Sequence, residues 1–126
     1  ALDLLHIDRM DHGNRSMEDE GLITRLADER MTLTVCPLSN LKLCVVKDLK
    51  DHPVPEMLRR GLHVTLNSDD PAYFGGYVNA NYKQLATAVG LTREQVTQIA
   101  RNSFEGSFLS ESEKARHLAK IDAYAA

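Results

Sequence analysis

Alternating apolar and polar side chains predict three short β-strands, at residues 9–12, 31–36 and 63–68. Side chains on a strand point alternately to its two faces, and the second and third segments contain the β-branched residues that strands favour. Pro37 follows the second segment directly, and Pro71 closes the turn after the third. Because proline lacks a backbone N–H, both positions suit the end of a strand.

The segments between these strands have helical spacing. Leu22, Ile23 and Leu26 fall on one side of a helix for which Ser16 is the predicted N-terminal cap. Residues 55–61 indicate a short helix, with proline in the first turn, arginines in the last and glycine at the end. Strands alternating with helices, without hairpin turns, predict an α/β fold with parallel strands joined by helical crossovers.

The C-terminal part of the chain is predicted to be helical, whereas residues 38–53 are expected to form a loop and a short irregular segment. A helix over residues 81–89 ends at Gly90. In a capping box, a Ser or Thr and a Glu or Gln three residues later bind each other's backbone N–H groups. Two such pairs begin the last two predicted helices: Thr92 with Gln95, and Ser110 with Glu113.

Polar residues follow each of the three strands. They are His12 and Gly13 after the first, residues 37–40 after the second, and Asp69 with Asp70 after the third. Parallel strands joined by helices present their functional groups at the carboxyl ends, so these clusters are expected on one rim. Strand ends are also polar simply because they face water, and the pattern alone fits both readings.

Asp69 and Asp70 are adjacent carboxylates at the end of a strand. Neighbouring strand residues point to opposite faces, so the two can serve one pocket only if the chain turns as it leaves the sheet. Two carboxylates ~6 Å apart repel by roughly 3 kcal/mol at an effective dielectric near 20, and a metal ion on one of them would relieve this repulsion. The alternative is an Asx turn with both carboxylates in solvent.

Three motifs in this order resemble the adenosine, adenine and AMP deaminase family. They are Arg-Met-Asp-His-Gly at residues 9–13, Cys-Pro-Leu-Ser-Asn at 36–40 and Asn-Ser-Asp-Asp-Pro at 67–71. The resemblance implies the C-terminal part of a (β/α)8 TIM barrel, with about three parallel strands and covering helices, so that residues 1–126 form the C-terminal portion of one deaminase domain. Such barrels need about 250 residues, so we expect a fragment.

The resemblance also implies a reaction. It is zinc-dependent hydrolytic deamination of a 6-aminopurine, adenine to hypoxanthine and ammonia, in purine salvage, with Asp69 as a Zn²⁺ ligand. His12 would lie beside the metal-bound water, and Asp70 would hydrogen-bond the purine at N7. The family's remaining metal ligands, three histidines, and its proton-donating glutamate have no counterpart here, so the fragment alone is expected to be inactive.

Other readings remain open at this point. The intact protein could act on adenosine, or on a pyrimidine or cyclic amide, and the chain could instead be a noncatalytic α/β module that binds or oligomerises. Residues 72–77 resemble the adenine branch, and their aromatic side chains could either wall a planar base or anchor the loop. The weaker site candidates are Gly13, Ser39, Asn40, Tyr73 and Phe74.

Composition narrows the partners. The net charge of −3 offers no basic surface for nucleic acid, and no apolar run approaches the roughly 20 residues that span a membrane. Cys36 and Cys44 do not make a disulfide framework, so a cytoplasmic protein is expected. The small purine substrate is what the family resemblance implies. Because strands cut from a closed barrel have open edges, we expect self-association through these edges.

The remaining histidines are expected at the surface or in helix packing: His6, His52, His63 and His117.

Overall fold

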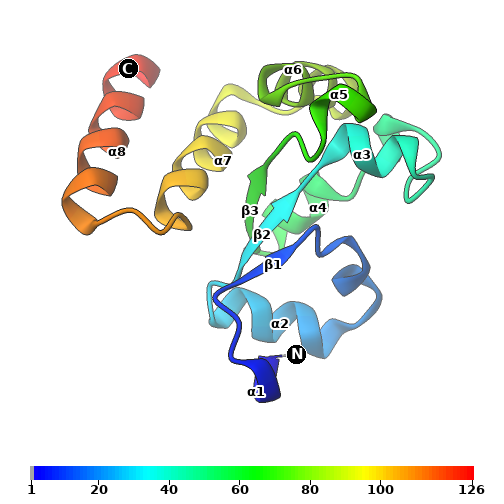
Figure 1. Cartoon of the computed structure of the whole chain (residues 1–126), viewed down its shortest axis with the longest axis horizontal. Helices are drawn as coiled ribbons and strands as arrows, with labels where there is room; N and C mark the ends of the chain where they lie inside the picture. The colour runs from blue at the N-terminus through cyan, green and yellow to red at the C-terminus, as the bar shows by residue number, and fades with distance from the viewer. Residues whose placement is uncertain (1) are drawn as a thin grey trace.

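A computed structural model describes residues 2–126. Three parallel strands, β1 (Arg9–Asp11), β2 (Thr32–Val35) and β3 (His63–Leu66), form one sheet in chain order (Figure 1). In this register Thr32 of β2 lies opposite Arg9 of β1 and His63 of β3. The predicted parallel α/β arrangement is confirmed, with each strand slightly shorter than expected.

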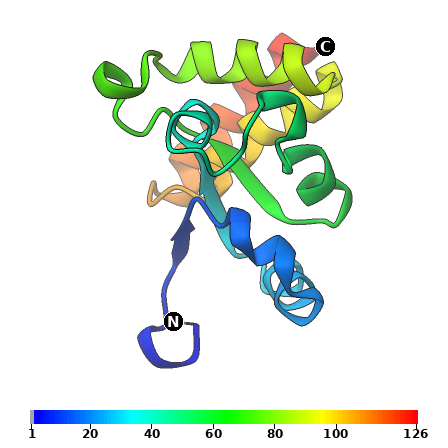
Figure 2. The same cartoon turned by 90° about the vertical axis from the view of Figure 1, so that its right-hand side faces the viewer.

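Helices connect and extend the sheet. They are α1 (Leu2–Leu5), α2 (Glu20–Asp28), α3 (Pro37–Lys42), α4 (Val54–Arg59), α5 (Pro71–Phe74), α6 (Val78–Val89), α7 (Arg93–Glu105) and α8 (Glu111–Ala125), with 3-10 turns η1 (Asn14–Glu18) and η2 (Leu49–Asp51). Both views place α6 beyond the carboxyl ends of the strands, and α1 beyond their other ends (Figures 1 and 2). Helix α7 packs along β3, and α8 packs on α7.

The start of α2 corrects the prediction. Asp19 is the N-terminal cap, and its side chain accepts a hydrogen bond from the Leu22 N–H. Ser16 lies in η1 instead, where its hydroxyl donates to the Gly13 carbonyl at 2.5 Å and is buried. Both residue types cap helices well, and Ser16 is already engaged with the turn before it.

Residues 37–42 also differ from the expected loop, because they form α3. Pro37 occupies the first turn of this helix, where a missing N–H costs nothing. The proline therefore ends β2 and begins a helix at once. Helix α6 starts at Val78 rather than at residue 81, while its end at Gly90 is confirmed. Both capping boxes are confirmed as well.

The hydrophobic core lies around β2 and β3. Leu33, Val35 and Val64 are fully buried, and Leu66 is nearly so. Helices on the sheet contribute further buried side chains: Ile23 and Leu26 from α2, Met57 from α4, Leu85 from α6 and Ile99 from α7. By contrast β1 is a partly exposed edge, and α8, described along its whole length, buries no side chain. The core thus holds the carboxyl ends of β2 and β3 firmly.

Gly106, directly after α7, lies against Thr32 of β2, and it gives a stability test. A Cβ atom there would overlap Thr32 Oγ1 and would lie 2.5 Å from Thr32 Cγ2. We therefore expect Gly106→Ala to lower the free energy of unfolding by about 2 kcal/mol, measured by urea denaturation. The control is Gly61→Ala, where φ is +77° but nothing lies within 4 Å, and which should cost only about 1 kcal/mol. Equal losses would contradict the packing argument.

Candidate functional site

His12 and Asp69 meet at the carboxyl rim of the sheet. His12 directly follows β1, Asp69 lies three residues after β3, and His12 Nε2 is 3.8 Å from Asp69 Oδ2. Both residues have left-handed backbone conformations, with φ of 58° and 56°. Such a φ costs about 1 kcal/mol outside glycine, and strained residues of this kind concentrate at functional sites. The turn expected as the chain leaves β3 is present at Asp69.

Gly13 allows the chain to turn after His12. Its φ is +76°, and a Cβ atom there would lie 2.9 Å from a methyl carbon of Leu33. Gly13 therefore combines a positive φ with a close approach to the central strand. The His12 N–H donates to the Thr34 carbonyl at 3.1 Å, which extends the pairing of β1 with β2 by one bond and fixes the start of the turn.

Asp70 has a structural contact of its own. It is the N-terminal cap of α5, and its side chain accepts the Tyr73 N–H at 3.3 Å. The residue remains exposed at the rim. Asp69 and Asp70 therefore make different contacts. Asp69 faces His12, whereas Asp70 caps α5 and stays accessible to a ligand.

Tyr73 and Phe74 belong to α5, so the segment at residues 72–77, expected to be a loop, begins as a helical turn. Their rings pack edge to face, with centroids 5.0 Å apart. Tyr73 is 70% exposed and Phe74 is half-buried, so Phe74 anchors the turn while Tyr73 remains free to contact a ligand.

Ser39 and Asn40 are both buried in α3, but only Asn40 reaches the site. Ser39 is fully buried, and its hydroxyl has no hydrogen-bond partner within residues 2–126. Asn40 Nδ2 lies 3.4 Å from His12 Nδ1, and Asn40 Oδ1 lies 3.1 Å from His52 Nε2. Asn40 thus connects His12 to a second histidine.

His52 is buried between α3 and α4, so of its two predicted environments, the surface and helix packing, the structure shows the second. It is 3% exposed, and its Nδ1 accepts the Val54 N–H at 3.3 Å. Burial lowers the pKa of His52 to about 4, which keeps the ring neutral at pH 7. No local signal marked this position, because Lys50 and Asp51 before it are typical surface residues.

Cys36 is the third residue at the rim that can bind a metal. One ligand atom each from His12, Cys36 and Asp69 lies within 4.8 Å of the other two. The Cys36 thiol donates to the Thr34 carbonyl, and burial together with the charges of Asp69 and Asp11 raises its pKa to about 11. A thiol that stays protonated is a weak ligand. Sequence reasoning did not single out Cys36, although it directly follows β2.

The donors at this rim fit a divalent metal only in part. A carboxylate and an imidazole are ligands that zinc accepts, and the Asp69 side chain is 32% exposed and therefore reachable. Within the described part of the chain, this is the single group of three or more His, Cys, Asp or Glu side chains placed to hold an ion. A four-coordinate catalytic site therefore needs ligands beyond Asp69 and its neighbours.

A hollow of about 550 Å³ opens beside His12. Its walls include Asn14, Asn40, Leu43 and Val45. Its volume is in the range of small-molecule sites. Leu43 and Val45 are exposed in its wall, so the hollow has an apolar side.

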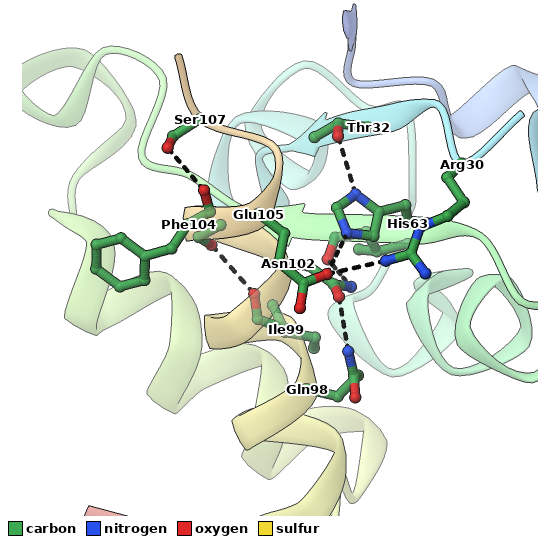
Figure 3. Close-up of polar contacts among 11 residues, drawn as sticks. Arg30, Thr32, His63, Gln98, Ile99, Asn102, Phe104, Glu105 and Ser107 are labelled. Carbon is green, nitrogen blue, oxygen red and sulfur yellow. Dashed lines mark hydrogen bonds and ion pairs between the residues drawn. The ribbon is translucent and has the colours of Figure 1, made fainter. Parts of the chain in front are cut away.

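A second polar cluster lies at the opposite ends of the strands (Figure 3). His63 Nδ1 lies 2.9 Å from Thr32 Oγ1, and its Nε2 lies 3.3 Å from a Glu105 oxygen that also pairs with Arg30 at 2.9 Å. Burial lowers the pKa of His63, and Glu105 offsets part of that effect. The cluster ties β2, β3 and the end of α7 together, so His63 is not a surface residue and instead packs against a helix, the other environment predicted for it.

The remaining two histidines match their prediction. His117 stacks on Phe104, with ring centroids 4.5 Å apart, and so joins α8 to α7. His6 is exposed.

A family profile described as adenosine deaminase matches residues 1–124. The chain belongs to the adenosine deaminase family. The resemblance of the three motifs is thereby confirmed.

Relatives in this family are named adenine deaminases. The chain is 67% identical to one from Sphingopyxis alaskensis, over 99% of this chain and 37% of the relative, and 59% identical to one from Caulobacter vibrioides, over 100% and 37%. The chain therefore spans less than two fifths of these relatives.

Two solved structures resemble this family member closely. The adenine deaminase of Arthrobacter aurescens superposes with a TM-score of 0.96 at 49% identity, over 98% of this chain and 38% of that one. An amidohydrolase from Burkhoderia ambifaria, described with bound Zn, superposes with a TM-score of 0.88 at 27% identity, over 99% and 35%. The fold is thus that of part of a TIM-barrel deaminase, as predicted. Among residues 2–126, no helix combines the length and apolar character that crossing a membrane requires.

The buried neutral His52 predicts a pH dependence. A histidine in the unfolded chain binds a proton near pH 6.5, whereas His52 in the fold does so only near pH 4. The unfolded state therefore binds more protons in this window, and the free energy of unfolding falls as the pH drops through it, by about 3 kcal/mol in total. Above pH 6.5 the contribution is constant.

The measurement is urea denaturation at several values between pH 7.5 and pH 4, comparing the natural protein with His52→Gln. Other groups titrate in both proteins, so the difference between the two curves isolates His52. We expect the variant to lose less stability on acidification. Parallel curves would show that His52 is not buried in its neutral form.

Proposed function

We propose that this chain is the C-terminal portion of a single-domain, zinc-dependent deaminase that hydrolyses adenine to hypoxanthine and ammonia. The observation that carries the proposal is the meeting of His12 and Asp69, both with left-handed backbones, on one rim of a parallel sheet. The names of the relatives at 67% and 59% identity support adenine as the substrate. The Zn described in the Burkhoderia ambifaria structure supports the metal.

Each rim residue has a role in this proposal. Asp69 provides a carboxylate ligand to zinc, and the remaining ligands come from outside this chain. When bound, zinc supplies Lewis-acid activation of the hydrolytic water. Asp70 orients the purine, because it remains exposed at the rim while it caps α5.

His12 acts on the oxygen that enters the purine. Hydrolysis forms a bond from C6 to that oxygen and breaks the bond from C6 to the exocyclic nitrogen, which leaves as ammonia. His12 Nε2 faces Asp69 and therefore lies where the incoming oxygen must be held. A hydrogen bond from this imidazole orients the oxygen and stabilises negative charge as it develops.

A cytoplasmic location and self-association belong to the same proposal. Cys36 and Cys44 are both free thiols within residues 2–126, which suits a reducing compartment. The partly exposed edge strand β1 has a neighbour on one side only, so another chain or another part of the barrel can pair with it.

Replacing Asp69 tests the metal and the reaction together. In the natural-length protein, we expect Asp69→Asn to weaken zinc binding at least about 100-fold and to lower adenine turnover by about 1,000-fold or more, because a neutral amide is a poor zinc ligand. Zinc content by atomic absorption and ammonia release from adenine, adenosine and AMP are the measurements. Asp28→Asn, exposed at the end of α2, is the control. A fully active, zinc-loaded Asp69→Asn protein would end the proposal.

Replacing Asp70 separates its two contacts. Serine caps helices about as well as aspartate but is too short to reach a purine, so Asp70→Ser should leave the free energy of unfolding within about 0.5 kcal/mol. We expect kcat/KM for adenine to fall about 100-fold through the lost hydrogen bond. Asp19→Ser makes the same exchange at the cap of α2 and should leave kcat/KM unchanged. An unchanged kcat/KM in Asp70→Ser would exclude Asp70 from substrate binding.

A further inference from the structure

A line of hydrogen bonds runs from the backbone of α4 to the imidazole of His12. The Val54 N–H donates to His52 Nδ1 at 3.3 Å. His52 Nε2 lies 3.1 Å from Asn40 Oδ1, and Asn40 Nδ2 lies 3.4 Å from His12 Nδ1. We call the two middle side chains, Asn40 and His52, the relay. Both are buried, at 2% and 3% exposure, whereas the His12 side chain is 41% exposed.

The direction of every bond in this line follows from its buried end. A backbone N–H only donates, so His52 Nδ1 must accept. A neutral His52 then carries its proton on Nε2 and donates it to Asn40 Oδ1. This bond fixes the orientation of the Asn40 amide, because a flipped amide would place two donors against each other. Asn40 Nδ2 therefore donates, and His12 Nδ1 must accept.

We propose that Asn40 and His52 are positioning residues that hold His12 in the tautomer with its proton on Nε2, directed toward Asp69. The inference deepens the proposed function, since it rests on His12 acting at the reacting oxygen. In this tautomer His12 meets that oxygen as a hydrogen-bond donor. It stabilises the charge that develops there, and it does not begin the reaction as a base at Nε2.

Two features separate the relay from ordinary satisfaction of buried polar groups. First, within the described residues, each end of the Asn40 amide bonds to one histidine and to nothing else. Second, the low pKa of His52 keeps its ring neutral near pH 7, so that Nδ1 stays an acceptor and Nε2 stays a donor. Through these hydrogen bonds, the fixed position of the Val54 N–H determines that His12 Nδ1 is an acceptor.

The tautomer can be observed directly. In the natural-length protein labelled with ¹⁵N-histidine, long-range ¹H–¹⁵N spectra distinguish a protonated ring nitrogen from an unprotonated one, and His12→Gln identifies the His12 signals. We expect His12 to be protonated at Nε2, without zinc as well as with it. In Asn40→Asp the amide donor becomes an acceptor of the same shape, so the His12 proton should move to Nδ1. A natural protein with His12 protonated at Nδ1 overturns the proposal.

Kinetics test the consequence for the reaction. We expect His52→Leu and Asn40→Asp to lower kcat for adenine at least about tenfold, with KM and zinc content within about twofold. His52→Gln keeps an N–H donor toward Asn40 and should restore kcat to within about threefold of the natural protein. His6→Leu, at an exposed histidine, is the matched control for His52→Leu.

The possible results distinguish a failure of the relay proposal from a failure of the proposed function. Circular dichroism first establishes that each variant is folded, and His52→Gln and Asn40→Asp carry the test if His52→Leu is not. A natural protein that releases no ammonia refutes the proposed function, while the spectra still decide the tautomer. Variants that change the tautomer but leave kcat unchanged overturn the positioning role. Variants that bind less zinc or have a higher KM, without a lower kcat, overturn it as well. The expected pattern is a tautomer change with a loss confined to kcat.

Discussion

The site depends on the hydrogen-bond ladder of the central strand. β2 pairs with β1 on one side and β3 on the other, and the ladder continues past both neighbours through His12 N–H to the Thr34 carbonyl and Asn67 N–H to the Val35 carbonyl. These two bonds set where each outer strand leaves the sheet. The left-handed turns at His12 and Asp69 then start from fixed points, which brings the two side chains to within 3.8 Å.

Sequence reasoning succeeded where short-range physics decides the outcome. The capping boxes at Thr92 and Ser110 predicted two helix starts, because each joins residues three positions apart. The parallel sheet was predicted from the order of strands and helices along the chain, because a helix between two strands requires a crossover. It failed at Ser16 and Asp19, where two good capping residues compete within one turn. Proline at position 37 was predicted only to end a strand, although the same residue also begins a helix.

The candidate site also contains residues that the sequence predicted and one that it did not. His12 and Asp69 were found from motifs, and their approach to each other followed from parallel topology. His52 could not be found, because its burial depends on how residues 48–54 fold back against α3 and α6, a contact between distant parts of the chain. The polar character of its neighbours pointed toward solvent instead. A buried neutral histidine thus carries no signature in the local sequence.

The pairing of the strands has a consequence for how the site arises. The side-chain bond between Asp11 and Thr34 joins residues 23 positions apart, and that between Thr32 and His63 joins residues 31 positions apart. Each crossover is an independent loop that must close before the strands align. No short peptide carrying one of the three motifs can therefore show any part of the His12 and Asp69 geometry. The site exists only as a property of the assembled sheet.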